Sequence, residues 1–93
     1  MRIIVREGAE AGRVIEVDRE LSVGRIEGND VVVVDPRVSS RHATLKPADG
    51  GIELTDTGST NGTFVNGVRL ERARKLAAGD LVRVGETDLR FEA

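Results

Sequence analysis

The sequence predicts an all-β protein, a sandwich of two packed sheets made of about ten short strands. Three observations favour this fold class. Short apolar segments recur about every ten residues along the 93-residue chain. Residues that favour tight turns, chiefly Gly, Asn, Asp and Pro, separate these segments. The core must be aliphatic, because aromatic residues make up only 2% of the chain, and β-branched Val and Ile favour strands.

The apolar segments follow one another as candidate strands from the first residues of the chain to the last. In order, they are residues 2–5, 14–17, 21–23, 31–34, 43–45, 52–54, 64–65, 81–84 and 89–91. Several alternate with a period of two, which is typical of a strand with one buried face. In residues 87–92, for example, Leu89 and Phe91 would face the core while the charged residues between them would face water.

Two segments allow more than one interpretation. Residues 31–34 are four consecutive Val residues, which predict a strand that is either covered on both faces or close to the rim of the two sheets. Residues 68–78 contain many helix-forming residues and end before Gly79, a suitable helix C-cap. We predict strand and loop there, because a turn at residues 66–67 and a strand at 81–84 leave little room for a helix.

Composition argues against several classes of function. Lys and Arg number 14 against 16 Asp and Glu, a formal net charge of −2, so no excess of positive charge attracts nucleic acid. The basic run Arg69, Arg72, Arg74 and Lys75 contains Glu71 and lacks aromatic residues, which favours a solvated surface over a nucleic-acid site. The chain has no Cys and one His, so we expect no disulfide, no metal site and no cofactor.

The length and hydropathy pattern predict one compact unit away from membranes. No apolar stretch approaches the roughly 20 residues of a membrane span, and residues 1–7 lack the long apolar segment of a signal peptide. We therefore expect a cytoplasmic, monomeric protein that contacts no membrane. Residues 1–93 are expected to form a single domain.

A hydrolase is the enzymatic alternative, because Ser39 or Ser40 could form a catalytic triad with His42 and with Asp35 or Asp56. Two absences argue against it. The five residues 58–62 carry Thr where a nucleophile elbow has Ser at its centre. The sequence also contains neither a phosphate-binding loop ending in Gly-Lys-Ser/Thr nor a dinucleotide fingerprint. We therefore predict a non-catalytic protein.

Three clusters of glycine and polar residues lie between the predicted strands. They are Gly24 with Arg25, the Ser-Ser-Arg-His sequence of residues 39–42, and the glycine-rich residues 56–67. In this order the chain resembles the forkhead-associated (FHA) domain, a phosphothreonine-binding module with the pattern Gly-Arg, Ser-x-x-His and Ser-x-Asn-Gly-Thr-x-x-Asn-Gly. The resemblance extends over residues 2–91. It implies about eleven short strands in two antiparallel or mixed sheets, with binding loops at one end.

The resemblance also implies which residues contact the phosphate of a phosphothreonine. These are Arg25, Ser39 and Thr60, assisted by the backbone around Ser40 and by the side chain of Arg41. A phosphothreonine brings about −1.5 to −2 charge and three acceptor oxygens. Its receptor therefore needs a guanidinium, hydroxyl donors and backbone N–H groups, and these residues supply all three kinds of donor.

Further residues are expected to hold the peptide or to shape the loops. Asn61 would hold the main chain of the peptide, because a side-chain amide donates and accepts hydrogen bonds at once. Arg37 would read a residue beyond the phosphothreonine, with an acidic or polar preference three residues after it; a solvated loop arginine is the alternative. The residues expected to structure the loops are Gly24, His42, Asp56, Gly62 and Asn66.

The predicted function is binding to a phosphothreonine-containing protein or peptide, downstream of a Ser/Thr kinase. The alternative is a sandwich of the same fold that binds its partner independently of phosphorylation, as some members of the family do. Selection of Thr over Ser would need a small apolar depression for the γ-methyl group, which is worth about 1 to 3 kcal/mol in a fitted pocket.

Overall fold

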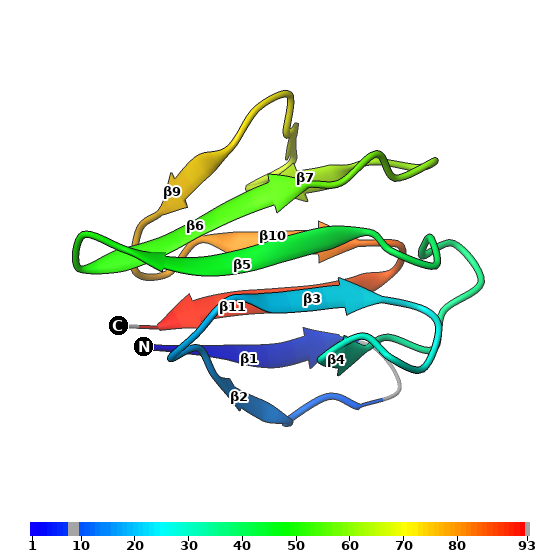
Figure 1. Ribbon diagram of the computed structural model, residues 1–93, viewed down its shortest axis with the longest axis horizontal. Helices are drawn as coiled ribbons and strands as arrows, with labels where there is room; N and C mark the ends of the chain where they lie inside the picture. Colours follow the sequence, from blue (N-terminus) through cyan, green and yellow to red (C-terminus); the bar gives the residue numbers. More distant parts are fainter. Residues whose placement is uncertain (8–9, 93) are drawn as a thin grey trace.

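The predicted two-sheet sandwich is confirmed by a computed structural model of the chain, which describes residues 1–7 and 10–92 (Figure 1). Eleven strands form a six-stranded sheet and a five-stranded sheet, and the described residues contain no helix. Accordingly, no helix in this part of the chain is long and apolar enough to cross a membrane.

The larger sheet has the strand order β2-β1-β11-β10-β7-β8. Its strands are β1 (Arg2–Glu7), β2 (Val14–Glu16), β7 (Thr63–Val65), β8 (Val68–Arg69), β10 (Leu81–Val84) and β11 (Thr87–Glu92). Neighbouring strands pair antiparallel. The register places Ile3 opposite Phe91 and Val82 opposite Leu89, so that apolar side chains of adjacent strands share the inner face.

The smaller sheet has the order β4-β3-β5-β6-β9 and is mixed. Its strands are β3 (Leu21–Gly24), β4 (Val31–Val32), β5 (Ala43–Ala48), β6 (Gly51–Asp56) and β9 (Arg74–Leu76). β3 and β4 pair in parallel, and the other pairs are antiparallel.

The core lies between the inner faces of the two sheets and is almost entirely aliphatic. Leu89 and Phe91 are each 2% exposed, which confirms the inward and outward alternation predicted for residues 87–92. From the smaller sheet, Leu45, Ile52 and Leu54 pack against them as part of one cluster. Burial of this apolar surface is the main favourable contribution to folding.

One prediction about residues 31–34 is wrong: the segment is not a strand covered on both faces. Only Val31–Val32 pair with β3, while Val33 is buried and Val34 is 80% exposed. β4 is an edge strand, so its alternate side chains face water. The other interpretation, a strand at the rim of the sheets, is the one that the structure shows.

The prediction of strand and loop in residues 68–78 is confirmed. β8 pairs with β7 in the larger sheet, whereas β9 pairs with β6 in the smaller one. The segment between β8 and β9 therefore crosses from one sheet to the other (Figure 1). A continuous helix there would remove both edge pairings.

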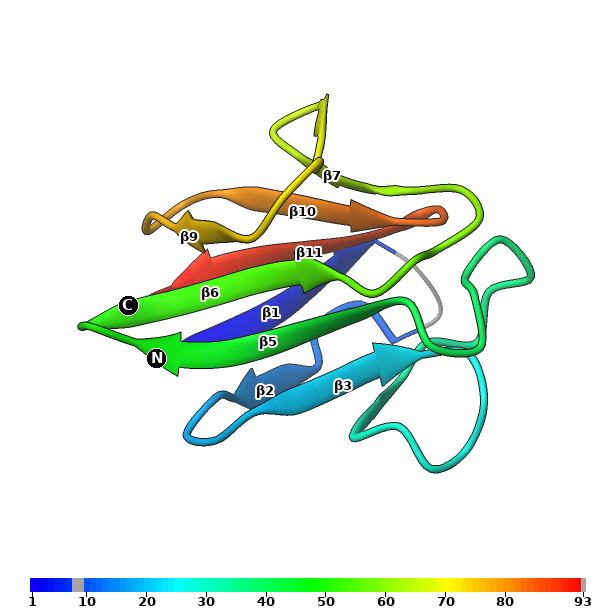
Figure 2. The ribbon, with the colours of Figure 1, turned by 45° about the horizontal axis from the view of Figure 1, so that its top comes forward.

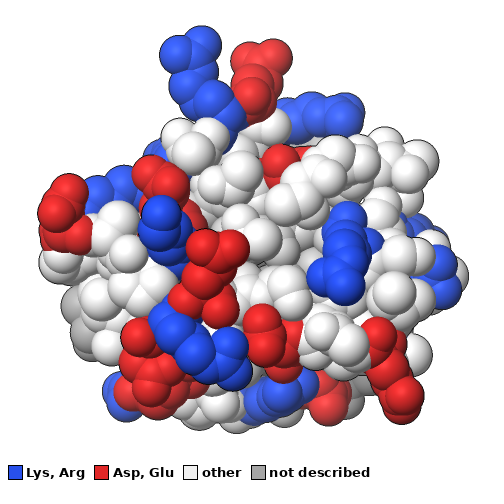
Figure 3. All heavy atoms as spheres, viewed as in Figure 1, with Lys and Arg blue, Asp and Glu red and all other residues white. Residues whose placement is uncertain are grey.

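The loops that carry the three sequence clusters gather at one end of the sandwich. These loops follow β3, precede β5 and connect β6 to β7, and the turn between β10 and β11 lies beside them (Figures 1 and 2). Both chain termini lie at the opposite end. On the face shown in Figure 3, basic and acidic side chains are interspersed, in keeping with the net charge of −2.

Candidate functional site

Arg25, Ser39 and Thr60 are brought together by direct hydrogen bonds between their loops. The backbone N–H of Arg25 donates to the carbonyl oxygen of Ser39 at 3.0 Å, and its Nε donates to the carbonyl oxygen of Val38 at 3.0 Å. The Ser39 Oγ in turn accepts the backbone N–H of Thr60 at 2.9 Å. Arg25 and Thr60 are exposed and Ser39 is half-buried, so the three residues form one accessible cluster at the loop end, which is called the basin below.

Gly24 allows two loops to approach closely behind this basin. A Cβ atom on Gly24 would overlap the backbone carbonyl oxygen of Ser40 and would lie 2.6 Å from Nδ2 of Asn29. The side chain of Asn29 is buried there and donates hydrogen bonds of 2.8 Å to the carbonyl oxygens of Ile26 and Ser40. Gly is therefore required at position 24 by space, since any side chain would push the Ser40 backbone away.

Asn29 is a site-supporting residue that the sequence analysis did not identify. Its place after Gly28, in a turn between two predicted strands, was the available signal, but that signal indicates only a turn. Its partner, the Ser40 carbonyl, is 11 residues away in the chain. No local pattern shows this bond.

His42 lies behind the basin and links three parts of the chain. It is fully buried, and its Nδ1 accepts the backbone N–H of Ser39 at 3.1 Å. Because Nδ1 is the acceptor, Nε2 carries the proton and donates to the carbonyl oxygen of Gly62 at 2.9 Å. The backbone N–H of His42 donates to the carbonyl of Val23 in β3. A neutral imidazole thus holds the two recognition loops at a fixed separation.

Asp56 shapes the loop between β6 and β7. Its carboxylate accepts the backbone N–H groups of Gly58 and Ser59, each at 2.8 Å, and the hydroxyls of Ser59 and Thr63. The Ser59 Oγ also accepts the N–H of Gly62 at 3.0 Å. Burial opposes ionisation of Asp56, but these donors outweigh it and lower the pKa of the carboxyl below its ordinary value. Asp56 is therefore a charged organiser of the loop.

Asn61 and Arg37 connect the same two loops at the rim. Nδ2 of Asn61 donates to the carbonyl oxygen of Arg37 at 2.8 Å. The guanidinium of Arg37 lies 3.1 Å from the carboxylate of Glu86 and 3.9 Å from that of Asp35. The N–H groups of Glu86 and Arg37 also donate to Asp35 and hold the pKa of its carboxyl below the ordinary value. The charge of Arg37 is thus already compensated by its neighbours.

Not every residue singled out from the sequence lies in the basin. Asn66, with φ of 50°, bonds to Asp80 and to the backbone of Leu81 at the start of β10, which is the far end of the sandwich from the recognition loops. Ser40 and Arg41 are exposed next to the basin. Gly62 has φ of 90°, a conformation that favours glycine, as expected of the turn after Asn61.

The geometry argues against a catalytic triad. Nδ1 of His42 accepts the backbone N–H of Ser39, and the Ser39 hydroxyl oxygen is bonded to Thr60 instead of His42. Asp35 and Asp56 accept hydrogen bonds from other donors, none of which is His42. Among the described side chains, those of residues 1–6 and 10–92, no group of three or more His, Asp or Glu is placed to hold a metal ion.

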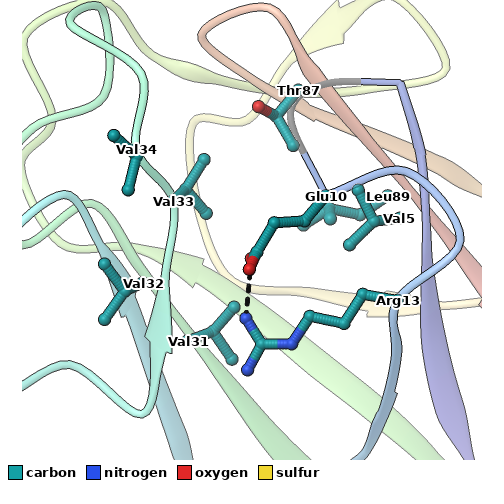
Figure 4. A pocket seen from close by; sticks show the side chains of 9 residues that line it. All are labelled: Val5, Glu10, Arg13, Val31, Val32, Val33, Val34, Thr87 and Leu89. Carbon is teal, nitrogen blue, oxygen red and sulfur yellow. Dashed lines mark hydrogen bonds and ion pairs between the residues drawn. The ribbon is translucent and has the colours of Figure 1, made fainter.

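A separate hollow lies at the side of the sandwich and contains none of these residues. It is about 90 Å³ in volume and is lined by Val5 and Leu89 from the larger sheet, by the valines of residues 31–34, and by Thr87 (Figure 4). An ion pair of 2.8 Å between Arg13 and Glu10 borders it. Its apolar lining offers little to a phosphate, so the loop end remains the candidate site.

Comparison with known proteins identifies the family. The sequence model of the FHA domain matches residues 21–85, which include all three motif clusters. The chain belongs to the FHA domain family. FHA domains are phosphothreonine-dependent interaction modules, so the resemblance noted in the sequence, the fold that it implied and the prediction of a non-catalytic binding module are confirmed.

The curated relatives of this FHA domain include proteins of mycobacteria. It is 48% identical over 69 residues to the ABC transporter ATP-binding/permease protein Rv1747 of Mycobacterium tuberculosis, covering 74% of this chain and 8% of that protein. It is 37% identical over 90 residues to the glycogen accumulation regulator GarA of Mycolicibacterium smegmatis, covering 96% of this chain and 56% of that protein. The chain thus spans about half or less of the length of these two relatives.

Solved structures of FHA domains have the same architecture. One comes from a structural and functional analysis of phosphothreonine-dependent FHA domain interactions, and it matches this chain with a TM-score of 0.84 at 27% sequence identity. The alignment covers 99% of this chain and 96% of that one. The likeness therefore extends over both sheets and the loop end.

Proposed function

We propose that this FHA domain binds a phosphothreonine segment of a partner protein in the basin formed by Arg25, Ser39 and Thr60. The observation that carries the proposal is the double role of Ser39. Its carbonyl oxygen is bonded to the backbone of Arg25, and its Oγ is bonded to the backbone of Thr60. A cationic side chain and two hydroxyl-bearing residues are thereby held in one exposed basin, which suits a dianion with three acceptor oxygens.

Hydrogen bonds within the site already hold the remaining donor groups of Arg25 and Ser39 in position to bind a phosphate. Arg25 uses Nε to bond Val38, which leaves its terminal N–H groups for a phosphate. Ser39 uses its oxygen as an acceptor, which leaves the hydroxyl proton to be donated. The backbone of Ser40 and the exposed side chain of Arg41 would assist from the same loop. A receptor whose donors are held in place spends less free energy on ordering them when it binds.

We further propose that Asn61 holds the main chain of the peptide. One N–H of its amide is used to bond the Arg37 carbonyl, which fixes the side chain, while its other N–H and its oxygen can pair with a peptide backbone. The specificity role of Arg37 is weaker in this proposal, because an incoming acidic residue would compete with Glu86 for the guanidinium.

The proposed test is binding of a phosphothreonine peptide to the wild type, to Arg25→Ala and to Arg90→Ala. Loss of the Arg25 charge should weaken binding by about 2 to 5 kcal/mol, roughly 30-fold to several thousandfold. Arg90→Ala is the matched control: it removes one exposed cation from β11, opposite Leu81 and away from the basin. Urea unfolding of each variant checks the fold. Equal affinity of Arg25→Ala and wild type would refute the proposed site.

The same assay, with altered peptides, tests which chemical features of the ligand the domain recognises. A phosphoserine peptide should bind about 10- to 200-fold more weakly than the phosphothreonine peptide, the range expected for loss of one methyl group. A peptide with Asp in place of the phosphothreonine should fail, because a carboxylate carries one charge and lacks the tetrahedral oxygens. Tight binding of the unphosphorylated peptide would favour the alternative, a partner recognised independently of phosphorylation.

The cellular setting is part of the proposal. A phosphothreonine partner places the domain downstream of a Ser/Thr kinase, in keeping with a relative named as a glycogen accumulation regulator. The net charge of −2 and the interspersed surface charges support a module that binds neither nucleic acid nor an anionic membrane surface. We propose that residues 1–93 act as one domain, as a monomer in the cytoplasm. Phosphatase treatment of a candidate partner should abolish its binding.

A further inference from the structure

Arg69 lies against the recognition loop although it comes from a different strand. β8 runs antiparallel to β7, with Arg69 paired to Phe64, so it returns toward the end of the sandwich where β7 begins. A Cβ atom on Gly62 would lie 3.0 Å from Nε and 3.1 Å from Cζ of Arg69. The guanidinium therefore lies against Gly62, the residue that follows Asn61. It is placed beside the residue proposed to hold the peptide.

The charge of Arg69 is not compensated in the way that the charge of Arg37 is. Arg37 has carboxylates of Glu86 and Asp35 within 4 Å. For Arg69, by contrast, no ion pair or side-chain hydrogen bond forms with any side chain that the structure describes, those of residues 1–6 and 10–92. An exposed guanidinium without a carboxylate partner is free to take an anionic ligand group.

The surroundings of Arg69 are also basic. The segment between β8 and β9 curves around an open hollow of about 340 Å³, whose lining includes Arg69, Arg72 and Arg74 together with Glu71. In Figure 3, basic side chains project at the top of the molecule with an acidic side chain beside them, over the segment that joins β7 to β9 in Figure 1. Three cations and one carboxylate line this hollow, which leaves an excess of positive charge around Arg69, although Arg74 is also close enough to Asp80 to lower the pKa of that carboxyl.

We propose that Arg69 binds a second anionic side chain of the same phosphopeptide and so determines specificity outside the phosphothreonine position. The inference rests on the proposed function, because it needs the peptide to cross Asn61. The anionic group is a carboxylate or a second phosphate, since a guanidinium pairs with both through two parallel hydrogen bonds. The surface at Arg69 thus extends the basin of Arg25 along the bound chain.

The test uses a phosphothreonine peptide with Ala at the four positions on each side. Each of these positions is replaced in turn by Asp and then by phosphoserine, and affinities are measured for the wild type, Arg69→Gln, Arg37→Gln and Arg90→Gln. In the wild type, Asp at one or two neighbouring positions should raise affinity about two- to fivefold, the range of an exposed ion pair, and phosphoserine should raise it more. The gain should shrink as salt is added.

Arg69→Gln should remove this gain, measured as the ratio of the affinities of the substituted and parent peptides for the same variant, and Arg90→Gln should keep it. The inference is overturned if no position shows a gain in the wild type, or if the gain survives Arg69→Gln. A gain that disappears in Arg37→Gln instead would assign the role to Arg37. Failure of the proposed function gives a different result, because the parent peptide itself would then bind Arg25→Ala and the wild type equally.

Discussion

His42 is the buried link on which the separation of the two recognition loops depends, and its two ring bonds can be removed one at a time. Nδ1 accepts from the Ser39 N–H, and Nε2 donates to the Gly62 carbonyl. In His42→Asn, the amide oxygen can stand near the position of Nδ1 and keep the bond to Ser39. In His42→Gln, the longer side chain can bring its NH₂ near the position of Nε2 and keep the bond to Gly62. His42→Ala removes both.

The size of each effect follows from burial. His42 is 0% exposed, so a lost partner leaves a buried backbone group unsatisfied at a cost of about 1 to 3 kcal/mol. His42→Ala should therefore lower the free energy of unfolding by roughly 2 to 6 kcal/mol, before any cost of the cavity. A chain of 93 residues has about 5 to 14 kcal/mol in total, so this variant should be close to unfolding. His42→Asn and His42→Gln should each lower the free energy of unfolding by about half as much as His42→Ala.

The two amide variants should differ in peptide binding. His42→Asn keeps the loop of Ser39 in place and should bind a phosphothreonine peptide within about threefold of the wild type, whereas His42→Gln should lose about tenfold or more. Urea unfolding and calorimetric titration measure the two quantities. Asn66→Ala is the matched control, since it disturbs the far end of the sandwich and should lower stability without changing affinity. Wild-type stability of His42→Ala, or equal affinities of the two amide variants, would refute this reasoning.

Two other perturbations have expected outcomes. Gly24→Ala should cost about 1 to 3 kcal/mol of stability and should weaken peptide binding, because the new methyl group displaces the Ser40 backbone; an unchanged urea midpoint would contradict the close approach. Acid should destabilise the domain below about pH 4, because Asp35 and Asp56 have lowered folded-state pKa values and therefore stabilise the fold only while ionised. Asp56→Asn should be less stable than the wild type at pH 7, yet its urea midpoint should fall less between pH 5 and pH 2; an equally steep fall would argue against a role of Asp56 ionisation.

Much of the site could be predicted because its residues stand in short motifs. The order Gly-Arg, Ser-x-x-His and Ser-x-Asn-Gly-Thr is visible in the sequence, and the loops that carry it meet at one end. The bonds between these loops could not be predicted. Thr60 and Ser39 are 21 residues apart, Asn61 and Arg37 are 24 apart, and Glu86 bonds to Asp35 across 51 residues. Their pairing depends on how two sheets pack.

In the fold, as in the site, some features could be predicted from the sequence and others could not. The alternation of Leu89 and Phe91 with charged residues specifies the inner face of β11, because side chains alternate along any strand. Four consecutive valines could not specify which of them would be covered: β4 ends at Val32, Val33 is buried and Val34, beyond the strand, is exposed. Edge position is a property of the assembled sheet.

The sequence by itself determined the strands, the turns and the motifs that are proposed to bind the phosphate, because strand periodicity and turn chemistry act over a few neighbouring residues. The tertiary structure alone decided which charges are free to bind. Arg37 and Arg69 look alike as exposed basic residues in the sequence, yet Glu86 compensates the first and the second rests uncompensated on Gly62. The reason is that electrostatic compensation depends on distances in space between residues that are far apart in the chain.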